Sequence, residues 1–263
     1  MERFNQKNLP EYKKLEYTDS KEETEKALEK IEGFRKFLDQ QISLPPEKWN
    51  EKFKEYVEEK YQESQEEIPE RTIEEEKNIT FERYLKNLDI SKEDLKDKRI
   101  LDLGCGDGEF VKECLDRNIS KEIYGLDSQI NPEDFEEKYR KYFLKGDFQK
   151  ELPMKNLDLI ISLAAVEAPF DKLNINSPKT TIDLALKALK ENGEIRIFPL
   201  RKTHPHSNLK GVEFSEKKWK EILKKLAAEK NIEYKICPID IKAAGKNKDV
   251  WLEQVLIIKK SKT

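Results

Sequence analysis

The chain has 263 residues, of which 40% are charged and 36% are hydrophobic, and its formal net charge is −3. This length suits one large domain, or a domain of ordinary size with an appendage. The absence of any run of 18 apolar residues excludes a transmembrane helix, and three cysteines without CxxC spacing suggest neither a disulfide framework nor a zinc site. The first residues lack the apolar core of a signal peptide, so a cytoplasmic protein is expected.

The charges are distributed unevenly along the chain. Residues 1–100 hold 27 acidic and 21 basic side chains, whereas residues 201–263 hold 8 acidic and 16 basic ones. A basic carboxyl third could bind RNA or an anionic substrate, or its lysines could simply coat solvated helices. The second interpretation is favoured because the lysines are not interleaved with aromatic residues.

The first 95 residues are predicted to form a mostly helical extension. Apolar residues recur at helical spacing after a capping box at Ser20, again over 46–61, and again from Phe81 to Leu88. The acidic stretch 63–77 is interpreted as a solvated connection. Such polar helices must pack on something, and their aromatic residues either line a lid over a pocket or only fasten the helices to the sheet. These aromatic residues are Trp49, Tyr56, Tyr61, Phe81 and Tyr84.

From Lys98 onward, strands and helices alternate, which predicts an α/β domain with a largely parallel sheet. Strands are expected at about 99–103, 122–127, 142–145, 157–163, 194–200, 232–239 and 251–259. Helices are expected near 108–117, 133–140, 178–191 and 215–230. The connection 244–249 is too short for a crossover helix, so the last strand should be antiparallel. The prediction is a seven-stranded, mostly parallel sheet with helices on both faces, in a domain spanning 96–263 after an extension spanning 1–95.

A glycine-rich turn follows the first strand. Residues 99–110 read RILDLGCGDGEF, with glycines at 104, 106 and 108. A dinucleotide loop needs G-x-G-x-x-G, but Glu109 occupies its last glycine position. The G-x-G-x-G turn preceded by Asp102 instead resembles motif I of the class I S-adenosylmethionine (SAM) dependent methyltransferases. That family also builds its sheet with one antiparallel strand at the end, so the resemblance implies SAM as the cofactor.

Each part of this turn has an expected role. Gly104 supplies the positive φ of a sharp turn, Gly106 lets the backbone approach the ligand, and Gly108 lets the next helix pack closely. The N–H groups that begin this helix suit the methionine carboxylate of SAM. Asp102 is suitably placed for the ammonium group, and Cys105 lies within the same turn.

The resemblance assigns further cofactor positions to the next strands. Asp127 ends the second strand, where a carboxylate can accept two hydrogen bonds from ribose hydroxyls, and Ser128 follows it. Asp147 and Phe148 match the acid and apolar residue that grip adenine in this family, although a simple turn with Phe148 in the core is the competing interpretation. Ser162, near the end of the fourth strand, would lie along the methionine side.

The residues that act on the methyl acceptor are not identified by any motif. Methyl transfer is an in-line displacement that depends on positioning, and many such enzymes need no general base. Residues 164–170 lack the signature of amide or base-nitrogen methylation, and no Pro-Cys nucleophile is present. The candidates for a polar role are Glu167, Arg201, His204 and His206, each of which could instead lie in an ordinary loop. No metal site is expected.

The expected activity is transfer of a methyl group from SAM to an unidentified acceptor, with a small molecule favoured. An RNA or protein acceptor stays open, and the alternative is a non-catalytic or RNA- or protein-binding module on the methyltransferase fold. An aminopropyl transferase is set aside because residues 161–165 lack its acidic pair. No membrane partner is expected, and no pattern indicates an oligomeric state.

Overall fold

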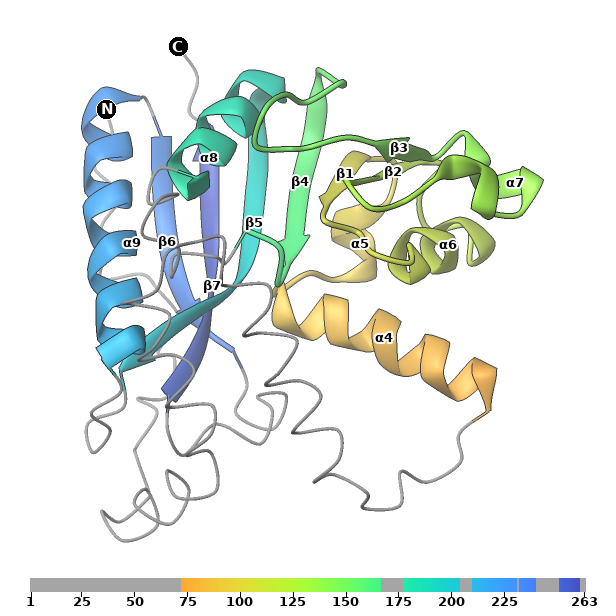
Figure 1. Ribbon diagram of the computed structural model, residues 1–263, viewed down its shortest axis with the longest axis horizontal. Helices are drawn as coiled ribbons and strands as arrows, with labels where there is room; N and C mark the ends of the chain where they lie inside the picture. Colours follow the sequence, from red (N-terminus) through yellow and green to blue (C-terminus); the bar gives the residue numbers. More distant parts are fainter. Residues whose placement is uncertain (1–71, 167–176, 204–209, 231, 240–250, 261–263) are drawn as a thin grey trace, which may run out of the picture.

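A computed structural model describes residues 72–166, 177–203, 210–230, 232–239 and 251–260. Its centre is a seven-stranded sheet with the order β3-β2-β1-β4-β5-β7-β6 (Figure 1). The strands are β1 Arg99–Leu103, β2 Glu122–Asp127, β3 Phe143–Lys145, β4 Leu157–Leu163, β5 Leu189–Thr203, β6 Ile232–Pro238 and β7 Trp251–Lys260. This order, with β7 antiparallel to both β5 and β6 and the other pairs parallel, confirms the predicted mixed sheet.

The helices cover both faces of the sheet, as predicted. They are α4 Ile73–Asn87, α5 Lys92–Leu95, α6 Glu109–Asp116, the 3-10 helix η3 Pro132–Asp134, α7 Glu137–Arg140, α8 Ser177–Ala188 and α9 Lys210–Glu229. Helices α8 and α9 lie on one face, and α4 to α7 lie on the other.

Alternation along the strands explains the two-sided core. In β1, the side chain of Ile100 belongs to the cluster with α4 and α6, whereas Leu101 belongs to the cluster with α8 and α9. In β7, Ile257 and Ile258 divide in the same way. Successive strand residues point to opposite faces, so each central strand needs apolar residues on both sides.

Helix α4 corrects the interpretation of the acidic stretch. It begins at Ile73, so residues 73–77 are helical and not part of a solvated connection. Thr72 and Glu75 form a capping box, and Glu74, Glu75 and Glu76 place negative charge in the first turn. Carboxylates in this position stabilise a helix N-terminus, so the acidic run promotes the helix.

Other boundaries also differ from the prediction: α9, expected near 215–230, begins at Lys210, and β5, expected over 194–200, extends to Thr203. Helix α8 ends at Ala188, three residues before the predicted end, and β5 begins at Leu189, which pairs with Leu157 of β4. The single helix expected over 133–140 is divided into η3 and α7, because Phe135 between them is extended and stacks on Phe143 at 3.8 Å.

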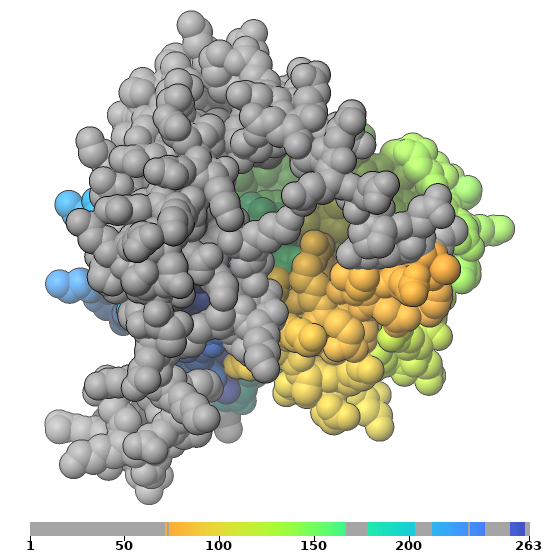
Figure 2. Space-filling model, turned by 90° about the horizontal axis from the view of Figure 1, so that it is seen from below, coloured from red at the N-terminus to blue at the C-terminus, as the bar shows by residue number. Residues whose placement is uncertain are grey.

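Helix α4 joins the core of the sheet domain. Phe81 is fully buried and Tyr84 is 6% exposed, with the Tyr84 ring stacked on Phe110 at 4.2 Å. Both aromatic residues therefore fasten the helix, whose outer flank remains on the molecular surface (Figure 2). The other predicted N-terminal helices, with Trp49, Tyr56 and Tyr61, lie outside the described residues, and the boundary at residue 95 stays a prediction. Among the described helices, none has the length and apolarity to cross a bilayer.

Candidate functional site

The glycine loop between β1 and α6 turns sharply at the carboxyl edge of the sheet. The φ angles are 72° at Gly104, 52° at Gly106 and 70° at Gly108. The Gly104 N–H donates to the Leu126 carbonyl at 2.8 Å, and the Gly108 N–H donates to the Cys105 carbonyl at 3.0 Å. These backbone hydrogen bonds hold the loop against β2.

Two of the glycines are enclosed, and the third faces open space. A Cβ atom would lie 2.1 Å from the Ala165 Cβ if added at Gly104, and 2.2 Å from the Phe143 ring if added at Gly108. A Cβ atom added at Gly106 would meet no atom within 4 Å. Gly106 is therefore the point where a ligand can lie directly against the backbone.

Asp127 is oriented beside this loop by two backbone donors. Its Oδ2 accepts the Gly106 N–H at 3.1 Å, and its Oδ1 accepts the Gln129 N–H at 2.8 Å. A carboxylate oxygen has two acceptor positions, so both oxygens can accept a further hydrogen bond. The half-buried Asp127 lines a cavity of about 530 Å³ together with Gly106, Lys112 and Phe135.

Asp102 is a buried carboxylate that lacks a cationic partner. Its side chain is 0% exposed, the Tyr84 hydroxyl lies close enough to act as a hydrogen-bond donor to it, and no described lysine or arginine is paired with it. Burial raises the pKa of Asp102 to about 7, the Tyr84 hydroxyl nearby acts against this rise, and the charge of Asp127 adds to it. Because an unpaired buried carboxylate is costly, a cationic group brought to it would be stabilised.

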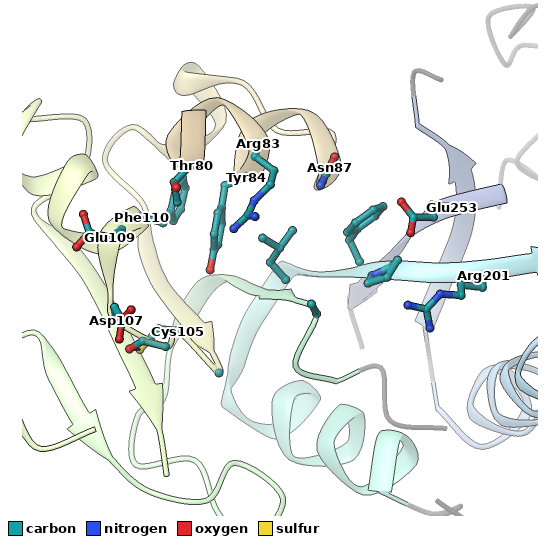
Figure 3. A pocket seen from close by; sticks show the side chains of 16 residues that line it. Thr80, Arg83, Tyr84, Asn87, Cys105, Asp107, Glu109, Phe110, Arg201 and Glu253 are labelled. Atoms are coloured by element: carbon teal, nitrogen blue, oxygen red, sulfur yellow. Dashed lines mark hydrogen bonds between the residues drawn. The ribbon is translucent and has the colours of Figure 1, made fainter. Parts of the chain in front are cut away.

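A second cavity, of about 520 Å³, lies between α4 and the carboxyl ends of β1, β4 and β5 (Figure 3). We call it the α4 cavity. Arg83, Tyr84 and Asn87 extend from α4 toward it, and the glycine loop borders one end. Gly106 and Asp107 line both this cavity and the Asp127 cavity, so the two spaces meet at the loop.

The other end of the α4 cavity carries two side chains of opposite charge. Arg201 in β5 lies opposite Glu253 in β7 in the strand register, and both line the cavity. Burial lowers the pKa of the Arg201 guanidinium to about 10, and the charge of Glu253 raises it. Arg201 is therefore a largely buried cation at neutral pH.

Three predicted cofactor residues have protein partners. The Asp147 carboxylate accepts the Gln149 N–H at 2.9 Å, and Phe148 packs against the core layer under α8 and α9. The fully buried Ser162 donates its hydroxyl to the Leu103 carbonyl at 3.0 Å, holding β4 to β1. These three side chains line neither cavity, so their predicted contacts with the cofactor stay predictions.

Of the remaining candidates, some line a cavity, and others do not or lie outside the described residues. Cys105 lines the α4 cavity, and burial raises the pKa of its thiol, whereas Ser128 is exposed and lines neither cavity. Glu167, His204 and His206 lie outside the described residues. Within the ranges given above, no three His, Cys, Asp or Glu side chains gather into a metal-binding cluster.

The structure adds site residues that the sequence did not indicate. Arg83, Asn87 and Glu253 line the α4 cavity, whereas the sequence pattern points only to the aromatic Phe81 and Tyr84 on this helix. Asn87 follows Tyr84 by three residues and so interrupts the apolar stripe of α4, which is a signal that could have been read. Glu253 is brought to the site by the β5–β7 register alone.

Residues 83–197 match the model of the FtsJ-like methyltransferase family. No curated protein matches the sequence. Among solved structures, the plantazolicin methyltransferase BamL is 16% identical, with 91% of this chain and 100% of that chain covered and a TM-score of 0.50. A SAM-dependent methyltransferase from Archaeoglobus fulgidus is 22% identical, with 72% and 95% covered and a TM-score of 0.44.

A phosphoethanolamine N-methyltransferase from Haemonchus contortus is 13% identical, with a TM-score of 0.47. The match covers 70% of this chain and 53% of that one, so the chain spans about half the length of this relative. At this identity, the likeness to BamL shows a shared fold. The match to the family model extends from the end of α4 into β5.

Proposed function

Because the chain belongs to the class I SAM-dependent methyltransferases, we propose that it methylates a small molecule bound in the α4 cavity. The observation that carries this proposal is that Gly106 and Asp107 line both cavities. A ligand that crosses the open face of Gly106 reaches the Asp127 carboxylate on one side and the α4 cavity on the other.

The residues at the loop fit the polar groups of SAM. We assign the ribose hydroxyls to the Asp127 oxygens, which two backbone N–H groups already orient. The methionine ammonium is assigned to Asp102, whose buried carboxylate has no cationic partner among the described residues. An ammonium beside this carboxylate would form a charge-assisted hydrogen bond.

The methionine carboxylate is assigned to Arg83, which replaces the expected role of the α6 N-terminus. Asp107 and Glu109 bring negative charge to that end of the α4 cavity, and Glu109 is paired with Lys112. The methionine carboxylate of SAM would be repelled at that end, whereas Arg83 extends into the same cavity from α4 and can attract it (Figure 3).

The chain contributes position and charge to the reaction. Bound SAM supplies a methyl group on a positively charged sulfur, which leaves as a neutral thioether after transfer. The apolar side chains of Leu163 and Phe198 line the cavity, which α4 covers. Holding the acceptor in line with the transferred methyl group supplies much of the rate in such reactions.

The cavity lining favours a small molecule over RNA. Its charged side chains include two cations, Arg83 and Arg201, and three carboxylates, Asp107, Glu109 and Glu253. RNA binding depends on lysine and arginine contacts to successive phosphates, and this lining does not provide an excess of positive charge.

The proposal is tested by methyl transfer from radiolabelled SAM into fractionated cell extract. We expect label in the small-molecule fraction and no salt-dependent shift of bulk RNA in gel electrophoresis. Label confined to RNA, with binding that weakens steeply between two salt concentrations, would contradict the small-molecule acceptor.

Replacing Asp127 should remove ligand-dependent stabilisation. S-adenosylhomocysteine (SAH) at 100 times its Kd should raise the unfolding free energy of the parent by about 2.7 kcal/mol. We expect Asp127→Ala to lose most of this increase because the ribose hydroxyls lose their acceptor. Thermal unfolding with and without SAH measures it. Asp116→Ala is the matched control, since Asp116 also has two polar partners, Lys138 and Tyr139, away from both cavities. Equal stabilisation of Asp127→Ala and the parent would disprove the ribose assignment.

Arg83→Gln should weaken binding only of ligands that carry the methionine carboxylate. A charge-assisted hydrogen bond contributes about 1.5–3 kcal/mol, so SAH affinity should fall roughly 10- to 100-fold. Affinity for 5′-methylthioadenosine, which lacks the amino-acid part, should stay within twofold of the parent. Calorimetric titration with both ligands measures the two changes, and an equal loss for both would assign Arg83 a general structural role.

A further inference from the structure

The α4 cavity extends past the residues assigned to SAM. Its far end is bordered by Asn87 from α4 and by Arg201 and Glu253 (Figure 3), and Phe198 and Pro199 of β5 also line the cavity. Resting on the proposed function, we propose that this end is the acceptor subsite and selects a small anionic acceptor with an apolar body and an O–H or N–H donor.

Asn87 supplies the first reason. Its side chain is 7% exposed and lines the cavity, and its Oδ1 atom has no hydrogen-bond partner among the described residues. A buried amide oxygen without a donor is destabilising because its hydration is lost and no hydrogen bond replaces it. If the amide were turned, its nitrogen would be left without a partner in the same place. A ligand that donates a hydrogen bond to Asn87 removes this cost.

Arg201 supplies the second reason, which is independent of Asn87. Its guanidinium is held near Glu253 by the β5–β7 register and faces the cavity from a mostly buried position. A planar guanidinium matches the two oxygens of a carboxylate or phosphate and binds them more strongly in a desolvated site. Glu253 balances this charge before the ligand binds.

The cofactor makes the preference for an anion stronger. The Arg201 and Glu253 charges cancel, so the positive sulfur of bound SAM leaves the acceptor end with a net positive charge. The apolar walls formed by Leu163, Phe198 and Pro199 suit the body of the ligand. A single negative charge on the acceptor therefore complements the loaded site.

The test titrates the full chain loaded with sinefungin, a SAM analogue that keeps a positive charge (a protonated amine) near the position of the sulfur, with matched probes by calorimetry. The probe is 3-hydroxybenzoate, with 3-hydroxybenzamide as its neutral counterpart and benzoate as the counterpart without the donor. Phenyl phosphate distinguishes a phosphate from a carboxylate preference. We expect 3-hydroxybenzoate to bind at least tenfold more tightly than either counterpart.

Two variants separate the two contacts. Arg201→Gln should abolish the preference for the anion over 3-hydroxybenzamide, and Asn87→Leu should abolish the preference over benzoate. Arg140→Gln, at an exposed ion pair with Glu133, is the control and should keep both preferences. Retained SAH binding by each variant shows that its fold and cofactor site are intact.

Two results would overturn the proposed subsite. One is equal affinity of the parent for 3-hydroxybenzoate, 3-hydroxybenzamide and benzoate, and the other is no binding of 3-hydroxybenzoate at millimolar concentration. Preferences that survive both variants would overturn it as well. Failure of the parent to bind SAH would instead disprove the proposed function on which the subsite rests.

Discussion

Gly106→Leu should abolish SAM and SAH binding while leaving the chain folded. The Cβ position of Gly106 faces open space, so the added side chain meets no protein atom close to the backbone and occupies the path between the two cavities. A side chain at φ 52° costs about 1–2 kcal/mol of unfolding free energy, which is far less than a core clash. We expect SAH affinity to fall at least 100-fold by calorimetry, with a cooperative unfolding transition retained.

The matched control for this variant is Asn118→Leu. Asn118 also has φ 52°, at the end of α6, and it lines neither cavity. It should carry a similar backbone cost and bind SAH like the parent. An SAH affinity of Gly106→Leu within threefold of the parent would mean that the cofactor does not cross the loop.

Asp102→Asn should stabilise the unliganded chain and weaken cofactor binding. Burial raises the pKa of Asp102 to about 7, so the folded state binds this proton more tightly than the unfolded state does. The contribution of Asp102 to the free energy of unfolding is therefore greatest below about pH 4, the ordinary pKa of an aspartate. It falls as the pH rises to about 7. The variant lacks this loss, so above pH 7 it should be more stable by an amount on the order of 2–4 kcal/mol.

The same substitution should act oppositely on the ligand. Losing the carboxylate removes a charge-assisted hydrogen bond to the ammonium, so SAH affinity should fall roughly 10- to 100-fold at pH 8. At pH 6, SAH binding to the parent should release a proton from Asp102, which calorimetry in buffers of different ionisation enthalpy detects. Asp102→Asn should release none. A variant that is less stable than the parent at pH 8 would contradict the buried, unpaired carboxylate.

The strands and the glycine loop could be predicted because their signals are local. Short, mostly apolar strand segments that lead into Asp102-Leu-Gly104, Asp127 or Ser162 have few other interpretations. The short connection before β7 requires an antiparallel pair. The positive φ predicted at Gly104 is observed, and Gly106 and Gly108 have a positive φ as well.

The walls of the α4 cavity depend on packing that the sequence does not express locally. The high density of charged residues predicts a solvated connection at the place where Thr72 and Glu75 form the capping box that begins α4. Asn87 becomes a site residue only because α4 turns that face to the carboxyl ends of the strands. Glu253 reaches the cavity through pairing with Arg201, more than 50 residues earlier in the chain. Helix rotation and strand register are tertiary properties.

A crystal structure of the chain grown with SAH tests the central claim most directly. The account predicts that the ribose hydroxyls contact the Asp127 carboxylate, that the ligand crosses the open face of Gly106, and that its amino group lies against Asp102 beneath α4. Density for SAH elsewhere, or side chains of the protein itself covering Gly106 between the two cavities, would contradict it.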